Sequence, residues 1–299
     1  MLFPPRVAVE VKALACELPS ESGLPLSRLS CGDIAREAVQ RCIVASISGT
    51  TVWRWLNADA IKPWSFRSWI FPRDPDFAQK AELVLDLYHG AWKGDPLGPH
   101  DYVISADEKP SIQARARCHP GKAPTAGHPQ LIEFEYARRG ALAYFAAWDV
   151  HRAKVFGRCE QTTGIDAYRR LVDQVMQQEP YKSACRVFWV TDNGSSHRGA
   201  ASVQRLREWY PNAIQVHTPV HASWLNQIEI YFSIVQRKVL TPNDFHDLDA
   251  VEARILEFQD LYQRHATPFQ WKFTREDLKR VLQKCTIKTS AVHVGTEAA

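Results

Sequence analysis

Apolar side chains along the middle of the chain predict an alternation of strands and helices. Apolar runs typical of strands cover residues 101–109, 131–138, 140–150, 153–160, 186–192 and 213–220. Apolar residues at helical spacing cover residues 164–179, 200–210 and 224–240. Strands that form a meander and then alternate with helices predict an α/β protein with a mixed sheet flanked by helices. The order β-β-β-α-β-α-β-α is that of a ribonuclease-H-like fold.

The N-terminal part of the chain carries helical patterns only. Apolar residues recur at helical spacing between Ile34 and Cys42 and again between Val52 and Leu56, and Ser48 can cap the second helix. Two helices joined by a tight turn, at about residues 30–60, fit a helix-turn-helix, whose second helix enters the major groove of DNA. An ordinary helical hairpin fits the same pattern. The residues expected to face outward and bind DNA are Thr50, Thr51, Trp53 and Arg54.

Turn-forming residues divide the chain into regions. The stretch Gly90–His100 holds three Gly and two Pro, which is typical of a linker. We therefore expect a helical region at 1–89, a linker at 90–100, the mixed sheet at 101–247 and a helical tail at 248–299. An amphipathic helix in that tail, ending near His265, is expected to cover the sheet or to contact a second protomer.

Composition narrows the class of protein. The chain has 299 residues, of which 45% are hydrophobic and 23% charged, as in ordinary globular proteins. It lacks the run of about 18 apolar residues that a membrane span needs, and its start is a poor secretory signal. Seven scattered cysteines without a CxxC pair indicate reduced thiols, hence a cytoplasmic protein without a structural zinc site.

Charge points toward a polyanionic partner without proving one. The net charge is +4. No acidic residue occurs from Lys109 to Leu131, where Arg115 and Arg117 lie, so this segment is either a solvated loop or a contact for DNA phosphates. The Pro- and Trp-rich stretch that holds Arg67 either follows a DNA groove or only ties the helical region to the sheet.

Three acidic residues stand out by their positions. Asp107 and Asp192 each end a predicted strand, and strand ends meet at the rim of an α/β sheet, where ligands collect. Glu229 follows Ile228 on the last helix of the sheet region, about 100° around from the packed face, so it can point toward the same rim.

Converging carboxylates would repel one another unless cations bind. Hard oxygen ligands suit Mg²⁺ or Mn²⁺, and two such ions can clamp a phosphodiester between the attacking and the leaving oxygen. Taken singly, Asp192 before Asn-Gly fits a turn former, Asp107 a charged strand end and Glu229 a helix-face charge. Their joint placement favours the metal site.

Three blocks carry a family resemblance: SADEK, VTDNGSSHRG and HTPVHASWLNQIEIYFSIVQRKVL. They resemble the catalytic blocks of DDE transposases, in particular the bacterial insertion-sequence group related to mariner elements (IS-630 type). The resemblance implies that Asp107, Asp192 and Glu229 bind the divalent metal ions and catalyse DNA cleavage and joining. The separation 229 − 192 = 37 is close to that of the group, and Gln227 stands where many relatives have Pro.

Other polar residues near these blocks are candidates for supporting roles. Asn193 is expected to turn the chain away from the site, and His197 and Arg198 to contact phosphate or to cap the turn. Asn226 is expected to orient Glu229 by a hydrogen bond. His221 precedes the same helix.

The expected function is therefore that of a cut-and-paste transposase acting on double-stranded DNA in the cytoplasm, at the nucleoid. The resemblance implies insertion at TA dinucleotides and a homodimer bound to terminal inverted repeats and target DNA. Two alternatives stay open: a metal-dependent endonuclease without strand transfer, and an inactive remnant or repressor that only binds DNA. Because relatives carry further helices upstream, the start at Met1 also suggests a truncated reading frame.

Overall fold

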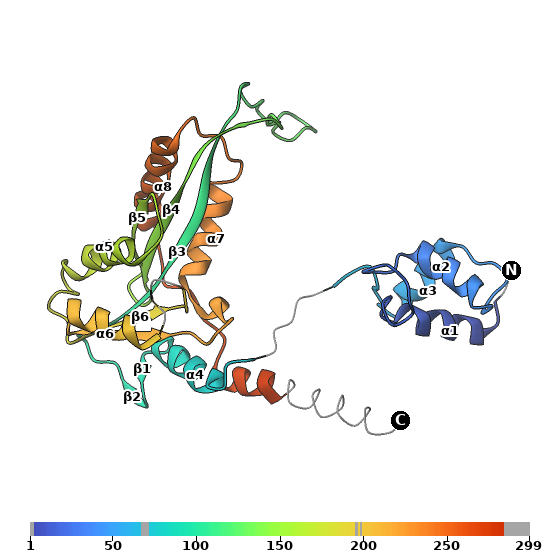
Figure 1. Ribbon diagram of the computed structural model, residues 1–299, viewed down its shortest axis with the longest axis horizontal. Helices are drawn as coiled ribbons and strands as arrows, with labels where there is room; N and C mark the ends of the chain where they lie inside the picture. Colours follow the sequence, from blue (N-terminus) through green and yellow to red (C-terminus); the bar gives the residue numbers. More distant parts are fainter. Residues whose placement is uncertain (1–2, 67–71, 195–196, 198, 284–299) are drawn as a thin grey trace. The chain divides into compact units, whose positions relative to one another are not determined.

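The computed structural model describes residues 3–66, 72–194, 197 and 199–283 (Figure 1). They belong to two compact units, Met1–Ile70 and Phe71–Ala299. The division falls earlier than the expected boundary at residue 89, because helix α4 (Phe77–Tyr88) packs into the core of the second unit. The expected linker holds a short hairpin instead, formed by β1 (Ala91–Trp92) and β2 (Asp95–Pro96).

The first unit contains three helices, α1 (Pro5–Ala15), α2 (Cys31–Gln40) and α3 (Gly49–Ala58). Their buried faces form one small core that includes Val11, Ile34, Val52 and Leu56. Ser48 caps α3 as expected, since its side chain accepts a hydrogen bond from the Thr51 N–H. The connection between α2 and α3 is residues 41–48, which is longer than the tight turn that the sequence suggested.

The second unit is built on a five-stranded mixed sheet with the order β5-β4-β3-β6-β7. The three antiparallel strands are β3 (Asp101–Ala116), β4 (Ala137–Asp149) and β5 (Lys154–Glu160). Strands β6 (Arg186–Thr191) and β7 (Ala213–His217) run parallel to β3. This mixed sheet, flanked by helices, confirms the predicted fold class.

Helices cover both faces of the sheet (Figure 1). Val103, Phe188 and Val190 face a core shared with α4, α7 (Ile228–Lys238) and α8 (Leu248–Gln263). The alternate residues, such as Ile104 and Trp189, face a second core with α5 (Ile165–Met176) and α6 (Gly199–Trp209). Helix α8 therefore packs on the sheet, which is one of the two roles that the sequence predicted for it. No helix within the described ranges is long and apolar enough to cross a membrane.

One predicted strand is wrong. Residues 131–136, the first part of the run at 131–138, lie in the excursion between β3 and β4 and form only an isolated bridge between Lys122 and Leu131. Apolar and polar residues alternate in this segment, but apart from that bridge it pairs with no strand among the described residues. Phe134 in this segment is 92% exposed. Strand β4 begins at Ala137 and continues through the next predicted strand to Asp149.

Helix α7 begins later than the pattern at 224–240 predicted, because a short 3-10 helix (Ser223–Leu225) precedes it. Gln227 forms the N-cap of α7 and is 1% exposed. Neither polar atom of its side chain has a hydrogen-bond partner among the residues that the structure describes. Leaving such groups unpaired in the interior costs folding free energy.

We expect the substitution Gln227→Met to raise the free energy of unfolding by about 1 to 3 kcal/mol, because it keeps the length of the side chain and removes both unpaired atoms. Urea unfolding measures the change. Gln79→Met, an exposed position on α4, is the matched control and should change stability little. A loss of stability in Gln227→Met alone would show that the buried amide is satisfied.

Candidate active site

Strand register brings Asp107 and Asp192 to the same level. Strands β3 and β6 pair in parallel, and their last paired residues are Ser105 and Val190. Asp107 and Asp192 each follow two residues later. The expectation that Asp107 ends a strand is wrong, since β3 continues to Ala116 beside β4. The rim that this expectation required is nevertheless present, because β6 ends at Thr191 and leaves that side of β3 uncovered.

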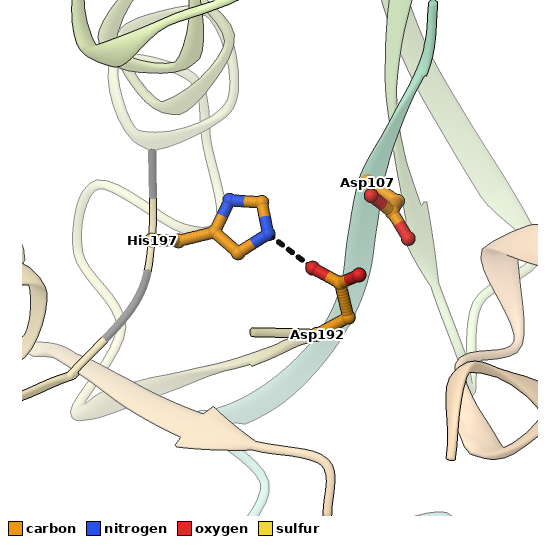
Figure 2. Close-up of side chains that lie close together, drawn as sticks. All are labelled: Asp107, Asp192 and His197. Carbon is orange, nitrogen blue, oxygen red and sulfur yellow. Dashed lines mark hydrogen bonds and ion pairs between the residues drawn. The ribbon is translucent and has the colours of Figure 1, made fainter. Parts of the chain in front are cut away.

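The loop after β6 fixes the Asp192 carboxylate (Figure 2). Its Oδ1 accepts hydrogen bonds from the Gly194 N–H at 2.7 Å and from His197 Nε2 at 2.5 Å. A Cβ on residue 194 would lie 2.8 Å from His197 Nε2 and 3.0 Å from Asp192 Oδ1. Glycine is therefore required for this close approach. The partly buried Asn193 donates a hydrogen bond from its side chain to the Thr218 carbonyl at 2.8 Å, which ties this loop to the segment after β7.

His197 is fully buried and held from several sides. Its carbonyl accepts hydrogen bonds from His217 Nε2 at 2.5 Å, Gln215 Nε2 at 3.0 Å and Ser202 Oγ at 2.8 Å. Its ring packs against Tyr168, with ring centroids 5.2 Å apart. The imidazole thus serves as a fixed donor to Asp192 and orients that carboxylate.

Asn226 joins Asp107 to the start of α7. Its Nδ2 donates to the Ala106 carbonyl at 3.1 Å and to Asp107 Oδ2 at 3.2 Å. Its Oδ1 accepts a hydrogen bond from Ser105 Oγ, which also accepts the Ile228 N–H at 2.9 Å. The sequence suggested that Asn226 orients Glu229, but its side chain contacts Asp107 instead. The reason is that Asn226 has an extended conformation before α7 and is not part of the helix.

Three side chains offer ligand atoms that all lie within 4.8 Å of one another: Asp107, Asp192 and His197 (Figure 2). Glu229 lies outside this group, in the first turn of α7. It is still within electrostatic reach, because its charge raises the pKa of Asp107 and the charge of Asp192 raises its own. The structure therefore places Asp107 and Asp192 together at the end of β6, with Glu229 outside this ligand group in the first turn of α7.

Burial, hydrogen bonds and mutual repulsion give these acidic residues different pKa values. The pKa of Asp107 is raised well above its ordinary value, first by burial and then by the charges of Asp192 and Glu108. Burial also acts to raise the pKa of Asp192, but the hydrogen bonds from His197 and Gly194 outweigh it and the net shift is downward. Burial raises the pKa of Glu229, against the opposing charge of Lys109. Of the two neighbouring carboxyl groups, Asp107 therefore holds its proton more tightly than Asp192 does.

Glu108 is an acidic neighbour that the sequence analysis left out. Its pKa is raised, first by burial, with His197 opposing and Asp192 adding to the rise. Successive residues of a strand face opposite sides, so Glu108 approaches His197 from the side of the sheet opposite Asp107. Its place directly after Asp107 in SADEK was the available signal.

The remaining candidates lie apart from the carboxylates. Trp53 is 48% exposed on α3, where Thr50 and Arg54 are also exposed, while the Thr51 hydroxyl contacts Ser48 and Arg54. His221 is exposed in the loop before the 3-10 helix. Arg115 lies farther along β3, and Arg117 directly follows its last residue, Ala116. Arg67 and Arg198 fall outside the described residues. The roles of all these residues stay predictions.

Comparison with protein families decides the class of this domain. A family model described as DDE superfamily endonuclease matches residues 103–252, which is half of the chain. The chain belongs to the DDE endonuclease superfamily. The match includes Asp107, Asp192 and Glu229, and it confirms the resemblance found in the sequence at the level of the superfamily. A search of curated proteins finds no match.

Solved structures of the mariner transposase Mos1 share the fold of this DDE endonuclease. The Mos1 paired end complex with Mn has a TM-score of 0.56 and 15% identity, over 96% of this chain and 80% of that one. The Mos1 strand transfer complex gives the same values. A pre-cleavage Mos1 transpososome has a TM-score of 0.55 and 16% identity, over 96% of this chain and 80% of that one.

The link between Ser105 and Asn226 gives a stability prediction. Asn226→Ala should lower the free energy of unfolding by about 1 to 3 kcal/mol, because the Ala106 carbonyl and Asp107 Oδ2 lose a buried donor. A double-mutant cycle with Ser105→Ala, followed by urea unfolding, should give a coupling energy above about 0.5 kcal/mol. Strictly additive losses would contradict the link.

The raised pKa of Asp107 predicts how stability depends on pH without metal. The folded state holds this proton more tightly than the unfolded chain, whose Asp pKa is about 3.9. The stabilisation is complete below that value and is lost as the pH rises through the folded pKa. We therefore expect the melting temperature of Asp107→Asn in EDTA, relative to that of the wild type, to rise from about pH 4 toward neutrality, because the variant lacks this loss of stability.

The control for this measurement is Asp101→Asn, at the other end of β3. A hydrogen bond from Arg186 lowers the pKa of Asp101, so its ionised form stabilises the fold. Asp101→Asn should therefore lower the melting temperature at neutral pH. An Asp107→Asn protein with the same pH dependence as the wild type would show that Asp107 is ionised in the folded chain.

Proposed function

We propose that this DDE endonuclease is a transposase that cleaves DNA at the ends of an insertion sequence and joins the freed ends to target DNA. The observation that carries the proposal is that Asp107 on β3 lies level with Asp192, which directly follows the adjacent strand β6. Glu229 interacts electrostatically with both carboxyl groups. A cut-and-paste course with insertion at TA dinucleotides is the form of reaction that the resemblance to mariner-related elements supports.

The donor set of the site fits Mg²⁺ or Mn²⁺. Clustered carboxylate oxygens are the ligands these hard cations prefer, and the acids repel one another in their absence. Asp107, Asp192 and Glu229 would hold the ions, two in this proposal. Bound cations would stabilise the attacking and leaving oxygens of the phosphodiester and make water a stronger nucleophile.

The surrounding residues of the chain set the geometry of these ligands. His197 and the Gly194 N–H keep Asp192 ionised and aimed at the rim. Asn226 holds Asp107, and Ser105 fixes the first turn of α7, where Glu229 lies. The N-terminal turn of a helix favours a negative charge, so this is a suitable place for a carboxylate ligand.

The partners in this proposal are the terminal repeats of the element and a target duplex, bound by a homodimer. Mos1 has been solved as a paired end complex and as a strand transfer complex, which supports DNA of this kind as the substrate. We propose that Thr50, Thr51, Trp53, Arg54 and Arg67 contribute to binding the terminal repeats.

A joining assay tests the proposal. A labelled duplex with a pre-cut terminal-repeat end is incubated with plasmid and Mn²⁺, and joined product is measured on a gel. Asp192→Asn and Glu229→Gln should each lower product by more than about 100-fold, because each removes a metal ligand. Glu257→Gln, an exposed carboxylate on α8, is the control and should keep activity.

The assay separates the alternatives. Nicking that depends on Mn²⁺ without any joined product would favour an endonuclease. DNA binding without nicking would favour a remnant or repressor. Sequencing the joined products tests insertion at TA.

A further inference from the structure

A polar groove lies along β3 just beyond the candidate active site. One wall is the end of β3 from Lys109, continued to Arg117, and the other is the end of α7 with the segment that follows it, from Gln236 to Asn243. The groove has a volume of about 400 Å³. Lys109, at one end of this wall, lies two residues after Asp107 on β3. The groove therefore begins two residues along the strand from the Asp107 carboxylate.

The cations of this groove lack carboxylate partners. Among the described residues, none of the ion pairs includes Lys109, Arg115 or Arg117. All three side chains are half-buried, and Arg115 Nε is buried without a hydrogen-bond partner within the described part of the chain. Half-buried cations without partners favour a bound anion.

The two arginines are held in place without being neutralised. Their guanidinium groups lie over the ring of Tyr136, at 4.8 Å for Arg115 and 5.8 Å for Arg117. Asn243 Oδ1 accepts a hydrogen bond from the backbone N–H of Arg115 at 3.1 Å, and the Asn243 carbonyl accepts one from the guanidinium Nε of Arg117 at 3.2 Å. Fixed donors lose little conformational entropy when they bind phosphate, which suits them to a phosphate site.

We infer that this groove binds the phosphodiester backbone of the DNA strand that leads away from the cleavage position. The inference rests on the proposed function. The nine residues from Lys109 to Arg117, along the end of β3 and one residue beyond it, reach at most about 26 Å, the length of about seven base pairs of DNA. Lys109 would contact phosphate next to the carboxylates, and Arg115 with Arg117 would contact phosphates farther along.

The salt dependence of DNA binding tests this inference. The whole chain, without divalent metal, is titrated with a fluorescein-labelled duplex longer than the groove at several salt concentrations. Each lost phosphate contact reduces the slope of log K against log salt by about 0.9. Arg115→Gln with Arg117→Gln should therefore reduce the slope by about 1.8 and weaken binding about 60-fold at about 0.1 M salt.

Two controls separate charge from folding. Arg115→Lys with Arg117→Lys keeps both charges and should retain most of the slope. Arg207→Gln removes an exposed cation from α6, on the other face of the sheet, and should leave slope and affinity unchanged. Melting temperatures identify any variant that does not fold.

A folded Arg115→Gln, Arg117→Gln variant with wild-type slope and affinity would overturn the inference that the groove binds DNA. Metal-dependent cleavage by the wild type would still support the proposed function. A wild-type chain that neither binds nor cleaves DNA would overturn both the groove and the proposed function.

Discussion

Repulsion between carboxylates at the end of β6 is the constraint on which the second unit depends. Two unit charges within the 4.8 Å that separates the Asp107 and Asp192 ligand atoms would repel by at least about 3 kcal/mol at an effective dielectric constant of about 20, and this repulsion adds to burial in raising the pKa of Asp107. The tightly packed sheet holds the two carboxylates close together despite this repulsion. Large buried side chains, among them Trp148, Trp189 and Phe188, fix the central strands from both faces. The acids therefore cannot relax apart by moving the backbone.

Within that frame, two hydrogen-bonded joints set the positions of the acids. One joint is the loop after β6, in which Gly194 lets His197 approach Asp192. The other is the contact of Ser105 and Asn226, which fastens β3 to the beginning of α7. Both joints use buried polar groups with named partners, and such networks specify one geometry because an unpaired member is costly. Precise placement of the carboxylates thus follows from short polar segments next to a well-packed apolar sheet.

The sequence predicted what depends on periodicity and on strand order. The mixed sheet, its flanking helices and the proximity of Asp107 and Asp192 follow from apolar runs and from the order of the strands. The sequence did not predict details that depend on which strands pair and where helices begin. Whether β3 ends at Asp107 is decided by β4, which continues alongside it, and not by the composition of β3. The partner of Asn226 depends on where α7 begins, and a 3-10 turn shifted that start.

The different pKa values of these acids also bear on how the site would acquire its cations. The pKa of Asp192 is lowered because His197 and Gly194 donate hydrogen bonds to it, whereas burial and neighbouring charges raise the pKa of Asp107. A carboxyl group must lose its proton to bind a metal ion. Binding of a cation by Asp107 would therefore compete with protonation of the same group. Binding and the stability of the sheet rim are therefore coupled, and both depend on the same buried carboxyl group.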